Sequence, residues 1–198
     1  MEKYFYEFFN SHLVDAESEE NWTEFLIDLK NRGLKGKTLR LITTDGNPAL
    51  KATLKRLFPY KRHQRCIWHK MTNIQAKAKK RNRKALMGQC KMIFRSPTRR
   101  EAIQRFKVWK KHWDIEEPAA VKCLAKDLRD CLTYYDFPKE HWKSIRTTNV
   151  LERSFREVRR RTRPMGGTFA SADRIYHNVF GLLNNNWKNH PAAFTHSP

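Results

Sequence analysis

Two carboxylates stand at positions from which they could face a bound ligand, and Asp45 is the first. It follows the short, apolar and β-branched segment 38–44 (TLRLITT), which predicts a buried strand, and Gly46 after it predicts a turn. Open α/β sheets bind ligands in the crevice outside the carboxyl ends of their strands, so Asp45 would face such a crevice. An ordinary Asp-Gly turn is the alternative interpretation of the same two residues.

Glu152 is the second carboxylate, and it lies on a helix predicted over about 149–163. An apolar stripe on this helix would lie against the core, and it consists of Leu151, Phe155 and Val158. The neighbouring stripe carries Glu152 and then three guanidinium groups, those of Arg156, Arg159 and Arg163. The alternative is structural: Asn149 and Glu152 match a capping box, and arginines often form a solvated helix face.

Basic residues are concentrated in two segments that would contact phosphates. Residues 51–110 hold twenty Lys and Arg against one acid, and the cluster 77–84 (KAKKRNRK) lies among them. Residues 143–163 form the second segment, with eight Lys and Arg against two acids. Side chains of this kind bind the nucleic-acid backbone through charge, and a solvated loop is the alternative for the cluster. The residues that we predict to bind DNA are Lys77, Lys79, Lys80, Arg81, Arg153, Arg156, Arg159, Arg160 and Arg163.

Cys66 and His69 have the spacing of half a zinc site, C-x-x-H. A second pair of ligands at the distance that a zinc finger requires does not follow, and His63 and Cys90 do not supply one. Packing is therefore the favoured role of Cys66 and His69, and a zinc-dependent DNA-binding module is the weakest of the functional hypotheses.

The elements that would position these residues alternate between strand and helix. A helix is predicted from Ser18 to Gly33, and another begins at Asn47-Pro48 and ends at Phe58-Pro59. The segment 65–69 (RCIWH) predicts a second strand, parallel to the first. Residues from about 70 to 143 predict only helices, with breaks at Ser96-Pro97 and Pro118, and a last helix is predicted over about 171–187.

Composition bounds the class of protein. The 198 residues carry 41 Lys and Arg against 20 Asp and Glu, for a net charge of +21. Such an excess favours a nucleic acid as partner, with an anionic membrane surface as the lesser alternative. Mean hydropathy is −0.82, and no apolar run is long enough to span a bilayer. Together with the lack of a signal-peptide pattern and of a disulfide framework, this predicts a cytoplasmic protein with reduced cysteines.

Three stretches of the chain together resemble the mutator-type transposases of bacterial insertion sequences. They are W-x-x-F-L-x-D-L-K-x-R-G-L-K-G (22–36), ITTDGNPALKATLKRLFPYKRHQRCIWHKMTN (42–73) and TTNVLERSFREVRRRTRPMGG (147–167). The resemblance implies a ribonuclease-H-like fold in which two Asp and one Glu hold two divalent metal ions for DNA strand cleavage and transfer. In that family the second Asp ends a strand just before Gly, as Asp45 does, a C-x-x-H pair follows, and a helical domain precedes the catalytic Glu.

The same resemblance assigns Glu152 the role of the catalytic Glu, because it lies in a Thr-Asn-x-x-Glu-Arg context. Two hard cations with oxygen ligands suit Mg²⁺. The family's first Asp has no match here, since Asp15 lies in an unrelated acidic segment. We therefore expect an N-terminally truncated copy with a partial ribonuclease-H-like α/β core, which lacks its first strands and is inactive alone.

The expected domains are 1–70 as the first part of this core, 71–143 as an all-helical insertion, and 144–198 as C-terminal helices that complete the core.

The expected partners are DNA and a second copy of the chain or a full-length transposase. A different class of function competes with the enzyme: a non-catalytic, basic DNA-binding remnant that coats DNA or interferes with an intact relative. The catalytic hypothesis differs from it in requiring Asp45 and Glu152 to share a divalent ion.

Overall fold

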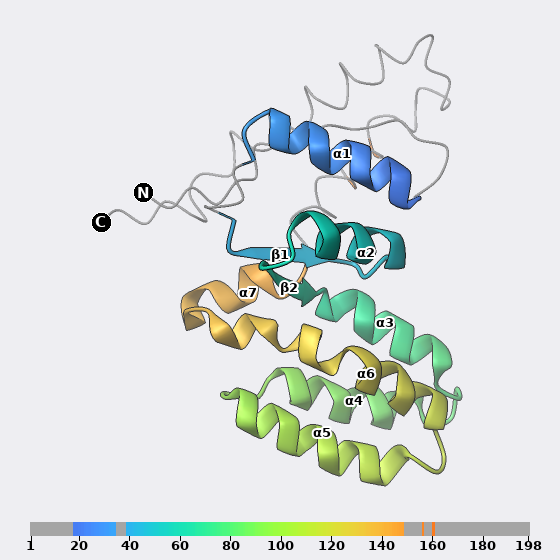
Figure 1. Cartoon of the computed structure of the whole chain (residues 1–198). Coiled ribbons are helices and arrows are strands. Elements are labelled where there is room, and N and C mark those ends of the chain that lie inside the picture. Colours follow the sequence, from blue (N-terminus) through green and yellow to red (C-terminus); the bar gives the residue numbers. More distant parts are fainter. Residues whose placement is uncertain (1–17, 35–38, 149–155, 157–159, 161–198) are drawn as a thin grey trace. The chain divides into compact units, whose positions relative to one another are not determined.

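The computed structural model of this chain describes residues 18–34, 39–148, 156 and 160 (Figure 1). Within them the fold is mixed α/β, mostly helical, with a small parallel sheet of two strands. The elements in order are α1 (Glu19–Asn31), β1 (Leu41–Thr44), α2 (Pro48–Leu57), β2 (Arg62–Arg65), α3 (Ile67–Lys77), α4 (Arg83–Phe94), α5 (Arg99–Trp113), α6 (Pro118–Cys131), the 3₁₀ helices η1 (Thr133–Asp136) and η2 (Lys139–His141), and α7 (Trp142–Ile145).

The chain divides into two compact units. The first unit comprises Met1–Arg40, Asn47–Lys61 and Asn149–Pro198, and the second comprises Leu41–Gly46 and Arg62–Thr148. The first unit therefore contributes α1 and α2 to the described elements, and the second contributes both strands and all the later helices.

Helices α1 and α2 of the first unit begin where the sequence predicts. The Ser18 hydroxyl accepts a hydrogen bond from the backbone N–H of Asn21 at 3.1 Å, and the Asn47 side chain accepts one from Leu50 at 3.2 Å. Each cap satisfies a backbone donor that has no partner inside its helix. The two helices pack against each other through apolar side chains, of which Leu26, Leu29 and Leu54 are buried.

The parallel pair of strands in the second unit is confirmed, but the second strand lies elsewhere than predicted. Strands β1 and β2 pair from Leu41 with Arg62 to Thr44 with Arg65. The prediction of a strand over 65–69 is wrong, since α3 begins at Ile67. The actual strand, RHQR, has no apolar residue. It can still be buried at Gln64, because hydrogen bonds satisfy this side chain. Its Nε2 donates to the Cys131 carbonyl at 3.1 Å and its Oε1 accepts from the Tyr134 N–H at 2.8 Å.

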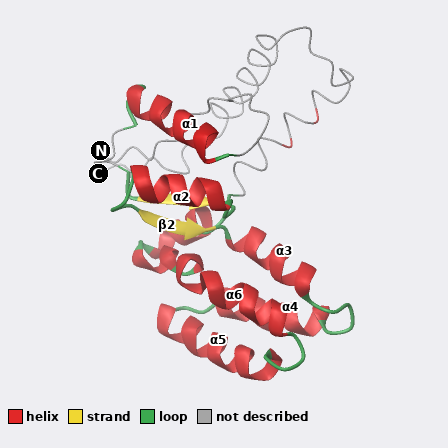
Figure 2. Ribbon diagram, turned by 45° about the vertical axis from the view of Figure 1, so that its right-hand side comes forward, coloured by secondary structure: helices red, strands yellow, loops and turns green. Residues whose placement is uncertain are grey.

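Helices α3 to α6 lie alongside one another in the second unit (Figure 2), and α4 packs on α5 as α3 packs on α6. The helices predicted between 70 and 143 are confirmed, and both predicted breaks lie at helix ends. One apolar core joins these helices, and its fully buried side chains include Ile74, Leu86, Cys90, Ile93, Ala102, Ala120, Leu124, Cys131 and Tyr134. The helices predicted over 149–163 and 171–187 lie outside the described residues, apart from Arg156 and Arg160, which are helical.

Candidate active site

Asp45 lies where the sequence predicts, directly after β1, and it is exposed. The next residue, Gly46, has a positive φ of 90°, a conformation that glycine adopts without strain. A Cβ atom on Gly46 would also lie 0.8 Å from Nη1 of Arg65, the last residue of β2. The backbone directly after Asp45 therefore provides the space that the guanidinium group of Arg65 occupies.

Cys66 and His69 lie beside the same ends of the strands and both contact Thr148. The backbone N–H of Cys66 donates to the Thr44 carbonyl at 2.7 Å, which extends the pairing of the strands by one residue. The buried thiol of Cys66 accepts hydrogen bonds from the N–H and the hydroxyl of Thr148, each at 3.4 Å. The Thr148 hydroxyl also lies 3.5 Å from Nδ1 of His69. The Cys-x-x-His pair thus contacts a residue that lies 82 positions after Cys66 in the sequence.

Two further contacts bring the chain before Thr148 to the sheet. The Thr43 hydroxyl donates to the Ile145 carbonyl at 2.8 Å, and the backbone N–H of Ile67 donates to the Arg146 carbonyl at 3.0 Å. One contact comes from β1 and the other from the first residue of α3, so the segment is fixed at two points. Residues 145–148 therefore lie beside the carboxyl ends of β1 and β2, and Asp45 directly follows β1 at this place.

Several predicted site residues lie outside the described residues, namely Glu152, Arg153, Arg159 and Arg163. Of the predicted arginine stripe and its neighbours, Arg156 and Arg160 are described, and both are helical and exposed. The structure therefore leaves the distance between Asp45 and Glu152 as a prediction.

The predicted basic cluster comprises the last residue of α3, the loop between α3 and α4, and the first two residues of α4. Its four DNA-binding candidates, Lys77, Lys79, Lys80 and Arg81, are all exposed. Glu117, only 2% exposed, holds the loop: its carboxylate accepts from the Lys79 N–H at 3.2 Å and from the Asn82 side chain at 2.8 Å. We name residues 77–84 the basic loop.

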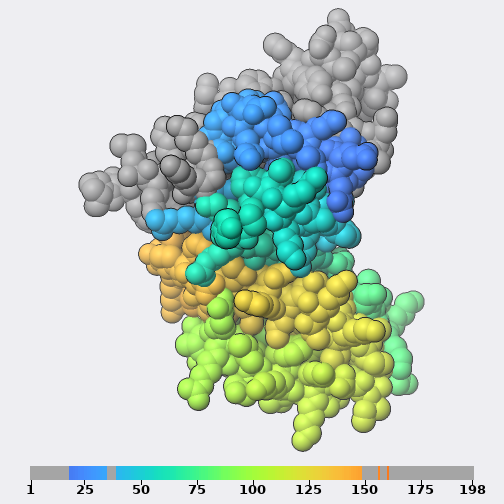
Figure 3. Space-filling view, in the orientation of Figure 1, coloured from blue at the N-terminus to red at the C-terminus, as the bar shows by residue number. Residues whose placement is uncertain are grey.

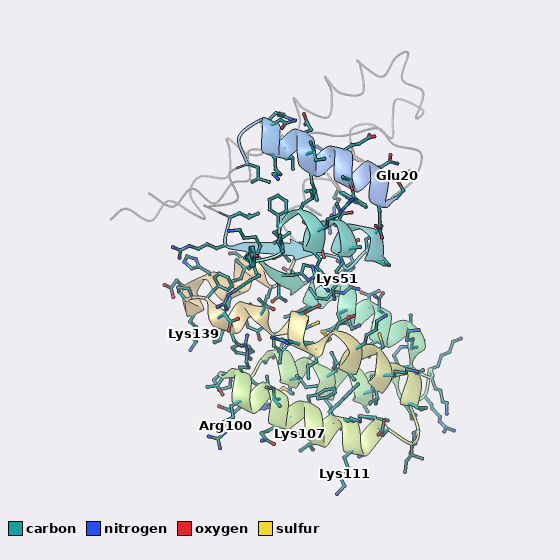
Figure 4. The ribbon with its side chains drawn as sticks, in the orientation of Figure 1. Glu20, Lys51, Arg100, Lys107, Lys111 and Lys139 are labelled. Atoms are coloured by element: carbon teal, nitrogen blue, oxygen red, sulfur yellow. The ribbon has the colours of Figure 1, made fainter. Side chains whose placement is uncertain are left out.

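A second basic surface lies on α5, mostly within the basic segment 51–110, although none of its residues is among the predicted DNA-binding residues. Arg100, Lys107 and Lys111 are exposed and point away from the helix on its outer side (Figure 4). Their spacing of seven and four residues puts them on one helix face. Figure 3 shows the yellow-green surface of α4 and α5 with side chains projecting into solvent. The helical spacing of these bases was visible in the sequence and would have identified the surface.

Two of the remaining cysteines have a packing role rather than a reactive one. Cys90 and Cys131 are fully buried, and burial is the main cause that raises the pKa of both thiols, to about 12 for Cys90. All four cysteines are free. A neutral, buried thiol packs as a small apolar side chain.

The donor set for a metal ion is incomplete in the described part of the chain. Within residues 18–34 and 39–148, no three His, Cys, Asp or Glu side chains form a cluster that could hold a metal ion. Asp45 fits one position of a Mg²⁺ site, because its carboxylate is exposed at the strand end and offers the oxygen ligands that this cation prefers. Further oxygen ligands must come from elsewhere, and Glu152 is the candidate that the sequence predicts.

No helix in the described residues is long and apolar enough to cross a membrane.

Comparison with known proteins identifies the family. The family model described as "Transposase, Mutator family" matches residues 7–190. The transposase for insertion sequence element IS406 of Burkholderia multivorans (strain ATCC 17616 / 249) is 37% identical over 172 residues, which are 86% of this chain and 44% of the relative. The transposase for insertion sequence element IST2 of Acidithiobacillus ferrooxidans is 37% identical over 146 residues, 74% of this chain and 49% of the relative.

The transposase for insertion sequence element IS1201 of Lactobacillus helveticus is 31% identical over 152 residues, which are 77% of this chain and 41% of the relative. The chain thus spans less than half the length of each of these three relatives. The match of the family model over nearly the whole chain confirms the resemblance carried by the motifs around Asp45, Cys66 and Glu152. The chain belongs to the Mutator family of transposases.

Proposed function

We propose that this chain is part of an insertion-sequence transposase that cleaves and transfers DNA strands, and that Asp45 and Glu152 are two of its metal-binding carboxylates. The relatives are transposases of insertion sequence elements, which supports the class of reaction. The core would be ribonuclease-H-like, and the two described parallel strands with the helix between them in sequence are compatible with part of such a core.

One observation carries the assignment of the two carboxylates. Asp45 follows β1, and Thr148 is held by Cys66 and His69 next to the end of β2, so both lie at the carboxyl ends of paired parallel strands. Glu152 follows Thr148 by four residues in the sequence. From this short separation in sequence, and from the family resemblance, we infer that Glu152 shares a divalent ion with Asp45.

The chain's own residues would hold and orient the DNA and the ion. A divalent ion bound between the carboxylates would stabilise the charge that develops on the phosphate oxygens during strand cleavage. Asp45 would contribute a carboxylate from a strand end, and Cys66 and His69 would position the segment that leads to Glu152. The buried thiol and the imidazole are thereby assigned to positioning rather than to zinc binding.

Replacing the metal with Fe²⁺ tests this site without requiring DNA cleavage. With ascorbate and peroxide, Fe²⁺ at the site should cut the polypeptide near residues 45 and 152, and Mg²⁺ should compete with it. Asp45→Asn should abolish both cuts, whereas Asp114→Asn, at an exposed carboxylate after α5, should leave them unchanged. Cuts near 45 without cuts near 152, or cuts that persist in Asp45→Asn, would contradict the shared site.

DNA is the proposed partner of the basic surfaces. Each phosphate that a protein neutralises steepens the fall of log K with log salt by about 0.9. We expect steep salt dependence and weak sequence preference, because the exposed bases of the basic loop and Arg156 would meet phosphates rather than base edges.

Fluorescence anisotropy with a labelled duplex measures this binding. The pair Lys79→Gln and Lys80→Gln should lower the salt slope by about 2, and Arg156→Glu with Arg159→Glu should weaken binding on all sequences alike. Lys139→Gln, at an exposed lysine of η2, is the control. DNA binding without Fe²⁺ cleavage near Asp45 would favour the alternative function, a non-catalytic DNA-binding remnant that coats DNA or interferes with an intact relative.

A further inference from the structure

Arg65 is a buried cation, and two of its three guanidinium nitrogens lack acceptors among the described residues. The residue is only 6% exposed. Its Nε and Nη1 atoms are buried and have no hydrogen-bond partner among the residues that the structure describes. A buried charged group normally has its donors satisfied, because leaving one unpaired costs about 1 to 3 kcal/mol and more for a charged group.

The guanidinium group of Arg65 lies against the residue that follows Asp45, the first candidate carboxylate. It lies against the backbone of Gly46, so closely that any side chain there would collide with it. Gly46 follows Asp45 at the end of β1, and Arg65 itself ends β2. The cation is therefore at the carboxyl ends of both strands, where α/β sheets bind ligands.

We propose that Arg65, seated on Gly46, binds a phosphate oxyanion beside Asp45, and this proposal deepens the proposed function. The guanidinium fork presents its N–H donors in a plane that matches phosphate geometry. A site that must hold a DNA phosphate together with a divalent ion needs an anion-binding group next to its carboxylates. Arg65 supplies the anion-binding group, and Asp45 supplies a carboxylate. The phosphate belongs either to the DNA backbone or to free inorganic phosphate, which has the same oxyanion chemistry.

The first test uses inorganic phosphate alone and measures thermal unfolding at constant ionic strength, with chloride as the replaced anion. Phosphate should raise the Tm of the wild-type chain and of the control Arg95→Gln, at an exposed arginine after α4. It should not raise the Tm of Arg65→Gln. Asp45→Asn should strengthen the effect of phosphate, because it removes a negative charge next to the site. An equal shift in wild type and Arg65→Gln would overturn the proposal.

A second measurement separates binding from a purely structural role. In phosphate-free buffer Arg65→Met should have a Tm equal to or above that of the wild type, because an apolar side chain of similar size replaces a buried, unpaired charge. A clearly lower Tm for Arg65→Met would show that the guanidinium stabilises the fold itself and would also overturn the proposal.

The source of the phosphate is decided with a labelled DNA duplex. If it is the DNA backbone, Arg65→Gln should weaken binding about tenfold and Arg65→Lys less, while Arg95→Gln changes it little. An unchanged DNA affinity together with a lost phosphate effect would support the anion site and assign it to free phosphate. None of these readouts depends on strand cleavage or on Fe²⁺, so the anion site and the transposase site can fail separately.

Discussion

Lys70 and Asp127 form an ion pair that joins α3 to α6 across the second unit. Their Nζ and Oδ2 atoms are 2.5 Å apart, and the lysine side chain is only 3% exposed. Removing one member of such a pair leaves the other charge poorly solvated, which typically costs about 3 kcal/mol or more. We expect Lys70→Met to lower the free energy of unfolding by about this amount in urea denaturation.

Two controls distinguish the buried pair from ordinary surface charge. The double variant Lys70→Met with Asp127→Leu should recover most of the loss, because no unpaired charge remains. Asp28→Asn breaks the exposed pair of Asp28 with Arg32 in α1 and should cost less than about 1 kcal/mol. A Lys70→Met variant as stable as Asp28→Asn would show that water reaches the Lys70 site.

Cys90 gives the stability of the chain a predictable dependence on alkaline pH. Burial raises the pKa of its thiol from 9.0 to about 12, and the nearby Cys123 contributes in the same direction. Below pH 9 the thiol is protonated in both the folded and the unfolded chain, so its contribution is constant. As pH rises from 9 toward 12 only the unfolded chain loses the proton, and stability falls by up to about 1.4 kcal/mol per pH unit.

Urea unfolding between about pH 8 and about pH 11 measures this dependence. Cys90→Ala removes the thiol, so its stability should fall less steeply with pH than that of the wild type, whatever its stability at neutral pH. Identical slopes for the two proteins would contradict the burial of a neutral thiol at Cys90.

At the scale of elements, the start of α6 holds the basic loop between α3 and α4. Glu117 precedes Pro118 of α6 and accepts hydrogen bonds from Lys79 and Asn82 in the loop. Glu117→Ala should leave the Lys79 N–H without its acceptor and cost about 1 to 3 kcal/mol. Hydrogen exchange followed by mass spectrometry should show faster exchange in the peptide that covers residues 77–84.

The neighbouring Glu116 provides a matched control for the loop. It also accepts a hydrogen bond from Asn82, at 3.1 Å, but it is exposed, so water can replace it. Glu116→Ala should therefore leave exchange in the basic loop nearly unchanged. Equal acceleration in both variants would mean that Asn82, rather than the buried carboxylate of Glu117, fixes the loop.

At the scale of the whole molecule, we expect the 198-residue chain by itself to leave supercoiled plasmid uncut in Mg²⁺ or Mn²⁺. The family resemblance implies three carboxylates for two ions, and only Asp45 and Glu152 match in this sequence. A missing ligand leaves the second ion poorly held, a defect on the order of several kcal/mol. Nicking that Asp45→Asn abolishes would contradict this prediction and would show that another carboxylate completes the site.

The sequence by itself determined the family, the excess of positive charge, and most of the helices. Spacing was sufficient for α1 and α2, because their apolar stripes and their caps at Ser18 and Asn47 are local features. The strand that ends just before Asp45 was equally visible, since a short β-branched segment before Asp-Gly carries its own signal. Local patterns are informative where the residues that stabilise an element lie close together in the sequence.

Only the tertiary structure decided what the polar segment before α3 does. RHQR gives no apolar pattern, yet it forms β2, because the acceptors and donors of Gln64 are met by the chain around Cys131 and Tyr134, some 70 residues away. The roles of Cys66 and Arg65 were hidden for the same reason. Cys66 meets Thr148, and Arg65 rests on Gly46, through contacts that depend on strand pairing rather than on spacing. Hydrogen bonds between residues distant in sequence leave no periodic trace, so the fold alone reveals them.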